Sequence, residues 1–180
     1  MARAAYPLHG FTGNVFSFGE GTVNDWIPVV FTDGIGVDDS LGILALALFL
    51  GCVLAGRIVG PFAISRWGRV RVLLVLVPLV IVGSLLVVCG GGYLPFLGVA
   101  LWGLGGSLGI PIAVSAAADD PNKAPARLSV VSTISFSSFL WGPLLVGFLG
   151  DNVGVRQALL AVTVMAGLAM GLLPATKVRS

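Results

Sequence analysis

Charge is scarce in this sequence: Asp, Glu, Lys and Arg together make up 10% of its 180 residues. Cysteine and histidine are rarer still, with two cysteines and one histidine. These low numbers exclude a disulfide scaffold, and they leave almost no ligands for a metal centre. What is abundant is apolar, since the hydrophobic fraction is 57% and the mean hydropathy is +1.03. This composition predicts an all-α integral membrane protein.

Long uncharged runs separate the charged residues, and each run can cross a bilayer as a helix of about 20 residues. The run between Arg71 and Asp119 is interrupted by the glycines at 90–92, which predicts two helices joined by a tight turn. The first segment is polar and contains Glu20, and we expect it to be a sixth helix packed inside the protein. The predicted spans are residues 6–30, 41–62, 71–89, 93–117, 128–149 and 155–175.

The basic residues indicate an orientation, because Lys and Arg collect in cytoplasmic loops. Six spans with both termini in the cytoplasm leave Arg156 as the one basic residue on the outer side. The outer loops then hold the acidic residues Asp33, Asp38, Asp39 and Asp151. We expect a multi-pass protein of a bacterial-type inner or plasma membrane, with no cleaved signal peptide.

The single predicted domain, residues 1–180, divides into two three-helix units at about 6–90 and 93–175. An odd number of spans in each unit inverts the second unit relative to the first, as in many secondary transporters. The loops 60–71 and 147–156 have related Gly and Arg patterns. Coincidence and common descent explain the similarity of these two loops equally well.

Glu20 is the leading candidate for chemistry, since a carboxylate far inside a span can carry a proton or hold a partner. Asn24 lies one helical turn further on and could orient Glu20 or bind a solute hydroxyl, whereas Asp25 points to another face. Trp26 and Trp102 could stack on a sugar ring. The structural alternatives are that Glu20 and Asn24 join helices, that Trp26 anchors at the membrane interface, and that Trp102 fills space.

Other motifs indicate packing or exclude a function. Gly142 and Pro143 predict a kink, with Ser137 and Ser138 near enough to satisfy the carbonyl that the proline frees. The glycine-rich segment 103–109 has no lysine and follows no strand, so it predicts a helix seam and not a nucleotide loop. The sequence offers no set of residues for an enzyme, no cofactor or metal site, and no nucleic-acid partner.

The chain resembles the C-terminal six-helix half of a Major Facilitator Superfamily transporter, nearest the fucose-permease-like and sugar-permease branch. The most specific similarity is the basic segment Arg57, Gly60, Arg66, Gly68, Arg69 and Arg71. Further similarities are Glu20-Gly21 with Asp25-Trp26, Ser132-Thr133 with Gly142-Pro143 and Gly147, and Asp151 with Gly154. The resemblance implies that the basic segment is an inner gate, although Pro61 stands where the family usually has an aspartate. A twelve-span family also implies that a second six-helix half or a homodimer partner completes the protein.

We therefore expect transport of a small polar, sugar-like solute by alternating access, with Glu20 as the candidate for proton coupling. The alternative is a non-transporting membrane protein, either a truncated permease remnant or an assembly partner. Basic residues at an inner loop are also consistent with this alternative, because they orient a membrane protein whatever it does.

Overall fold

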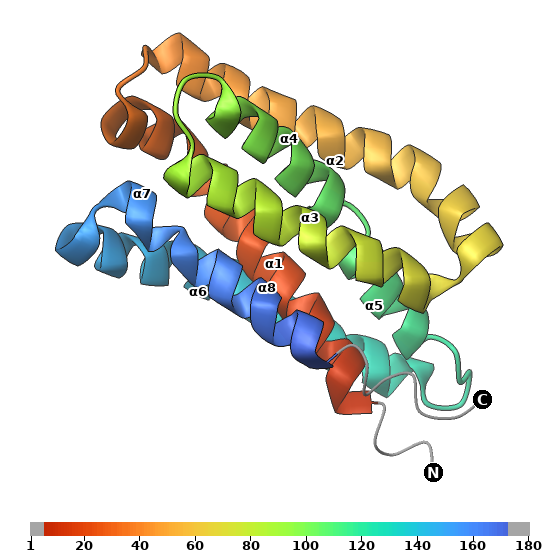
Figure 1. Cartoon of the computed structure of the whole chain (residues 1–180). Coiled ribbons are helices and arrows are strands. Elements are labelled where there is room, and N and C mark those ends of the chain that lie inside the picture. Colours follow the sequence, from red (N-terminus) through yellow and green to blue (C-terminus); the bar gives the residue numbers. More distant parts are fainter. Residues whose placement is uncertain (1–5, 173–180) are drawn as a thin grey trace.

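The computed structural model describes residues 6–172, which contain helices and no strand. The elements are α1 (Tyr6–Val29), the π-helical turn η1 (Val30–Ile35), α2 (Asp39–Trp67), α3 (Arg69–Cys89), α4 (Leu94–Gly106), α5 (Gly109–Ala117), α6 (Ala124–Val153), α7 (Val155–Ala158) and α8 (Leu160–Leu172). Because η1 extends α1, α5 continues α4 and α8 continues α7, these elements form six helical rods (Figure 1). Helices therefore occupy all six ranges in which spans are predicted, as far as Leu172.

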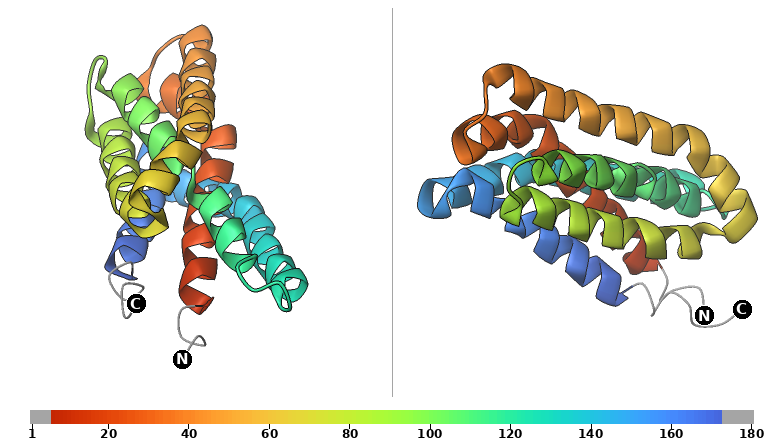
Figure 2. Two further views of the ribbon diagram at one scale, coloured as in Figure 1. Left: turned by 90° about the vertical axis from the view of Figure 1, so that its right-hand side faces the viewer. Right: turned by 45° about the horizontal axis from the view of Figure 1, so that its top comes forward.

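The rods pack so that α1 is central. It contacts α2, α5, α6 and α8, while α3 packs against α4 and α8, and α2 packs against α4. Figure 2 shows α2 along one edge of the bundle and α6 on the opposite side of α1. The second helix of each predicted three-helix unit thus packs against the first helix of the other unit. The two outer helices of these units, α3 and α8, pack against each other.

Two single glycines join long helices in the same unusual backbone conformation. Gly68 separates α2 from α3 with φ 80° and ψ 156°, and Gly154 separates α6 from α7 with φ 93° and ψ 142°. Residues with a Cβ atom are strongly disfavoured at these φ and ψ angles, so glycine is required at both helix junctions. The junction after α2 and the junction after α6 therefore have the same backbone conformation.

The predicted loop 60–71 is different in the structure. The chain stays helical through Pro61 as far as Trp67, and Gly68 is the one residue between α2 and α3. Arg57 and Gly60 consequently lie within α2, and Arg57 is about 16.5 Å from Gly68 at 1.5 Å per residue. The proline is tolerated because α2 continues on both sides of it and the bundle supports the helix.

Small residues allow the helices to approach closely. A Cβ added to Gly83 of α3 would lie 2.6 Å from the carbonyl oxygen of Gly98 in α4, and one on Gly98 would lie 2.6 Å from that of Gly83. A Cβ on Gly103 would likewise lie 2.6 Å from the carbonyl oxygen of Phe49 in α2. Backbone contact at glycine is the usual packing device of helices in lipid, where burial of apolar surface drives little association.

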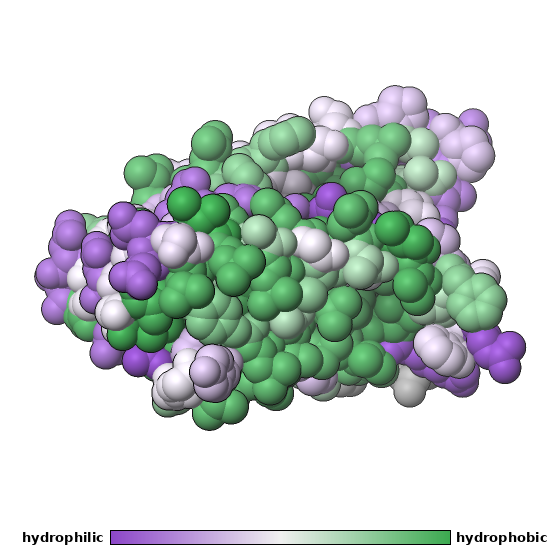
Figure 3. Space-filling view, turned by 90° about the horizontal axis from the view of Figure 1, so that it is seen from above, coloured by the Kyte–Doolittle hydropathy of each residue, from purple (hydrophilic) through white to green (hydrophobic). Residues whose placement is uncertain are grey.

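The surface is apolar where a bilayer would contact it. In Figure 3 hydrophobic residues cover the middle of the face and hydrophilic residues gather towards its two ends. Four helical segments are long and apolar enough to span a membrane, namely Asp39–Trp67, Arg69–Cys89, Leu94–Ala117 and Ala124–Val153, and a shorter apolar segment is Val155–Gly171. The polar rod α1 is not in this set. The described residues thus form an all-helical membrane bundle with its most polar helix at the centre.

Candidate functional site

An ion pair far from the helix ends joins α1 to α2. The Glu20 carboxylate oxygen Oε1 lies 3.0 Å from Arg57 Nη2, and Arg57 Nε–H donates to the backbone carbonyl of Ser107 at 3.3 Å. Glu20 is about 21 Å along α1 from Tyr6. The side chain of Glu20 is 20% exposed and that of Arg57 is 44% exposed. The guanidinium therefore bridges three helical rods and still presents N–H groups to the surface of this bundle.

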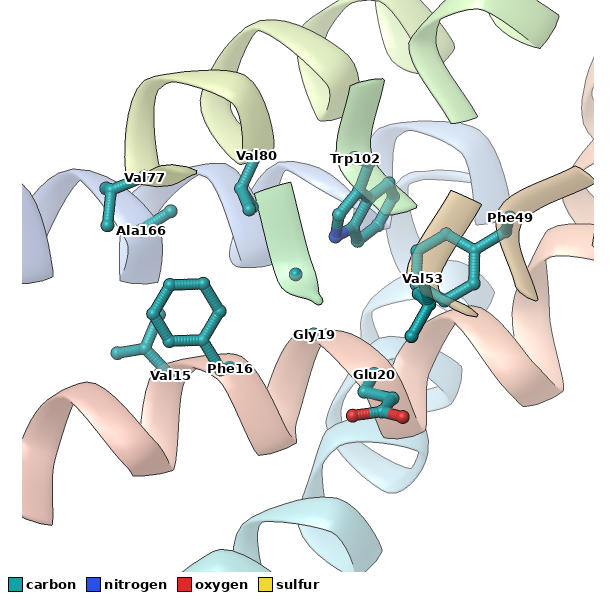
Figure 4. A pocket seen from close by; sticks show the side chains of 11 residues that line it. Val15, Phe16, Gly19, Glu20, Phe49, Val53, Val77, Val80, Trp102 and Ala166 are labelled. Carbon is teal, nitrogen blue, oxygen red and sulfur yellow. The ribbon is translucent and has the colours of Figure 1, made fainter. Parts of the chain in front are cut away.

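A small apolar cavity lies on the other side of Glu20, as Figure 4 shows. Phe49, Val53 and Trp102 line it, together with residues of α1, α3, α4 and α8, and its volume of about 10 Å³ is close to that of one water. Arg57 is the charged group that faces Glu20, since the remaining lining of the cavity is apolar or glycine.

Trp102 is part of the core. Its side chain is 1% exposed and packs edge-on against Phe49, with ring centroids 6.3 Å apart. The cavity that it lines is too small for a sugar ring. In this structure Trp102 holds α4 against α2, so its position favours the space-filling alternative.

The other candidates on α1 are Asn24, Asp25 and Trp26, and they do not all share the face of Glu20. Asn24 donates its side-chain N–H to the backbone carbonyl of Glu20 at 2.9 Å, and Asp25 is exposed. Trp26 donates its indole N–H to the carbonyl of Pro143 at 2.9 Å and lies over Gly147 of α6. The structure therefore brings Glu20 and Arg57 together, and it places Trp26 in the seam between α1 and α6.

A second cavity, which we call the serine cavity, lies between α1, α5 and α6. Its volume is about 190 Å³, and its polar lining is Ser17, Ser132 and Ser135, beside the aromatic rings of Phe136 and Phe139. The hydroxyls of Ser17 and Ser135 are buried and have no hydrogen-bond partner among the described residues. Neither hydroxyl is accessible to a water-sized molecule in this conformation, so both lie behind the apolar surface of the cavity, and buried polar groups without a partner are uncommon.

Sequence interpretation missed the serine cavity, although α1 carries a signal for it. Asn14, Ser17, Glu20 and Asn24 are spaced by three, three and four residues, which places them on one stripe of the helix. From this stripe Asn14 contacts Ser138 of α6, Ser17 lines the cavity and Glu20 reaches α2. A polar stripe on an otherwise apolar helix indicates a face turned towards polar groups.

The kink residues hold α6 against α1. Pro143 frees the carbonyl of Phe139, and Gly21 of α1 packs directly on that oxygen. Ser138, expected to satisfy this carbonyl, instead donates to Ile134 at 2.8 Å and contacts Asn14. Gly142 approaches the carbonyl of Phe18 in α1. The proline thus coincides with the closest approach of α1 and α6.

Basic residues gather at one end of the bundle. Arg69 Nη1 lies 2.7 Å from Asp119 Oδ2, and Arg69 Nη2–H donates to Ser115 at 2.9 Å. This contact ties the start of α3 to the end of α5. Arg66 and Arg71 are exposed at the same end, and Gly60 packs on Leu108, the residue before α5. Arg3, Lys177 and Arg179 lie outside the described residues.

The chain is similar to known transporters over almost its whole length. It is 29% identical over 173 residues to an uncharacterised transporter of Sinorhizobium fredii, covering 94% of this chain and 46% of that protein. It is 30% identical over 165 residues to an uncharacterised MFS-type transporter of Yersinia pestis, covering 87% of this chain and 43% of that protein. The chain thus spans less than half the length of these curated relatives. No family model matches it.

A solved structure shares the fold. The crystal structure of the peptide transporter POT in complex with alafosfalin superimposes with a TM-score of 0.82 and 22% sequence identity, over 94% of this chain and 37% of that one. At this identity the similarity concerns the fold alone.

Proposed function

We propose that this chain, which is related to Major Facilitator Superfamily transporters and has the fold of one half of such a protein, moves a small polar solute across a membrane by alternating access. The observation that carries the proposal is the Glu20–Arg57 pair, placed deep in the bundle and one helical turn from the serine cavity. Ionisable residues inside a membrane are costly, and they mark solute and proton pathways.

The serine cavity supports a sugar-like solute. A sugar hydroxyl that reached Ser17 or Ser135 would supply the hydrogen-bond partner that each of these buried hydroxyls lacks, and the phenylalanine rings can cover the apolar face of the ring. Its volume of about 190 Å³ suits a small solute and is too small for a large one. We also propose that the chain belongs to the fucose-permease-like branch of the family.

Glu20 is the proposed site of proton coupling. A proton on its carboxylate removes the charge that holds Arg57, so α1 and α2 can separate in the protonated form. Loss of the proton restores the ion pair and the contact. The proton gradient would thus act on the Glu20–Arg57 contact between α1 and α2, the two helices that we propose flank the path of the solute.

A second six-helix half or a second copy of the chain is the proposed partner. α2 and α6 are long, and the most apolar parts of each are only 22% and 17% buried. Large side chains such as Ile58, Phe62, Trp141 and Phe148 are more than two-thirds exposed on them. These two faces are available to a partner half. The matching junctions at Gly68 and Gly154 support two inverted repeats within the present half.

The proposed orientation follows the distribution of charge over the two ends. Arg66, Arg69, Arg71, Lys123 and Arg127 lie at the end where α3 begins and α5 finishes, and Asp33, Asp38, Asp39 and Asp151 lie at the other. The positive-inside rule places the basic end in the cytoplasm of a bacterial-type membrane, together with both termini.

The test uses the protein purified as it assembles in its native membrane and reconstituted in vesicles that contain a pH-sensitive dye. L-fucose and D-glucose are the probes. We expect a sugar to drive proton entry in the native protein, Glu20→Gln to abolish proton entry, and Asp25→Asn, a change at an exposed acid five residues away, to preserve it. Sugar uptake with unchanged pH dependence in Glu20→Gln would remove Glu20 from the mechanism. Absence of uptake of either sugar by the native protein would reject the sugar-like solute.

A further inference from the structure

We infer that the groove between α2 and α3 binds one anionic phospholipid, with an acyl chain in the groove and the headgroup at Arg71. The groove has a volume of about 540 Å³. Its walls are Val59 and Ala63 of α2 and Val72 and Val75 of α3, and Leu104 and Leu108 form its floor. This site is distinct from the serine cavity and does not depend on the proposed transport.

The shape of the groove follows from the connection at Gly68. The two helices meet at this single residue and then diverge, so they make few contacts with each other, and the junction of α4 and α5 fills only the bottom of the gap. Figure 1 shows α2 and α3 joined at one end with α4 between them. An apolar opening of this kind, on the side of a membrane helix bundle, faces hydrocarbon and not water.

The lining favours an acyl chain over a polar solute. Apart from Arg71 and the Ser107 hydroxyl, the side chains of the groove are apolar, and the Ser107 hydroxyl already donates to the carbonyl of Leu104 at 2.7 Å. A sugar would find almost no hydrogen-bond partner here. Val59 and Val75 are more than 60% exposed on the two walls. Hydrocarbon is the occupant that matches these surfaces without leaving polar groups unpaired.

The charge at the mouth selects the headgroup. Arg71 lines the groove at its Gly68 end and has no ion pair or hydrogen bond from its guanidinium among the described residues. Its neighbour Arg69 is already paired with Asp119. Trp67 lies at the same mouth, where an indole ring is typical of the membrane interface. Basic pockets between helices at the cytoplasmic face bind anionic lipid headgroups.

The test measures lipids retained by the purified protein assembly in native mass spectrometry. The assembly is taken from vesicles of equal parts phosphatidylglycerol and phosphatidylcholine. We expect a retained lipid with about a fivefold preference for phosphatidylglycerol, which corresponds to about 1 kcal/mol for one basic residue near anionic lipid. Arg71→Gln should abolish the preference, Arg71→Lys should keep it, and Arg66→Gln, a change at the same end outside the groove, should leave it unchanged.

A second variant tests the groove itself. Ala63→Phe fills the groove and should abolish lipid retention, whereas Ala47→Phe, at an exposed position of α2 away from the groove, should not. Equal retention of both lipids by the native protein would overturn the inference, as would retention that Arg71→Gln and Ala63→Phe leave unchanged. A photo-crosslinker at Val75 that reacts with another polypeptide in place of lipid would assign the groove to a protein partner and would also overturn it.

Discussion

Replacement of Gly21 by alanine should force α1 and α6 apart at the point where they are closest. A Cβ at residue 21 would lie 2.4 Å from the carbonyl oxygen of Phe139 and 3.1 Å from its Cα and carbonyl carbon. Ordinary contacts begin at 3.4 Å, so the oxygen is about 1 Å too close. The obstructing atoms belong to the backbone of α6 and cannot turn aside as a flexible side chain would.

The expected cost of Gly21→Ala is about 1–3 kcal/mol, the range for overpacking in a tightly packed interior. For a chain of this length each kcal/mol lowers the melting temperature by about 2–4 °C. The assay is thermal unfolding of the detergent-solubilised protein, followed by size-exclusion chromatography. Gly19→Ala is the matched control, because a Cβ at residue 19 meets its nearest atoms at 3.5 and 3.6 Å, which is ordinary contact. Equal melting temperatures for Gly21→Ala and Gly19→Ala would refute the predicted close approach of α1 and α6.

Three further changes should alter stability in defined directions, each measured by the same thermal assay. Trp26→Phe removes the hydrogen bond to the carbonyl of Pro143 and should cost about 1 kcal/mol, and an unchanged melting temperature would contradict that bond. Gly68→Ala places a Cβ at φ 80° and should cost about 1–3 kcal/mol, whereas a stable variant would show that the reversal tolerates side chains. Glu20→Met and Arg57→Met should each destabilise the protein more than the double variant does, because each alone leaves a charged partner unpaired inside the span; additive losses would argue against the ion pair.

Much of the helical architecture could be predicted because charge is so sparse. The uncharged run after Arg71 has room for two helices, and the glycines at 90–92 mark the turn between them, which the structure places between Cys89 and Leu94. Glu20 also stood out, because it is an acid far inside a predicted span. Both predictions depend on the high cost of placing charge in a membrane, and the positions of charged residues can be read directly from the sequence.

The partners of these residues could not be predicted, because they depend on how helices pack. Arg57 was grouped with the arginines of the implied inner gate, yet α2 continues through Pro61 and places the guanidinium against Glu20. Ser17 and Ser135 are ordinary residues of membrane helices, whose hydroxyls usually bond to their own backbone. Only the packing of α1 against α5 and α6 shows that these hydroxyls line a cavity.

Alternating access is the central claim, and the accessibility of the serine cavity from the two sides of the membrane tests it most directly. Ser135→Cys is introduced into a protein whose cysteines, Cys52 and Cys89, are replaced by alanine, and a membrane-impermeant thiol reagent is applied to right-side-out and inverted vesicles. Val23→Cys, at a fully buried position of α1, is the control that should remain unlabelled from both sides. A transporter half exposes the cavity to each side in turn, so we predict labelling of Ser135→Cys in both kinds of vesicle. Labelling from a single side under all conditions would contradict transport and favour a non-transporting assembly partner.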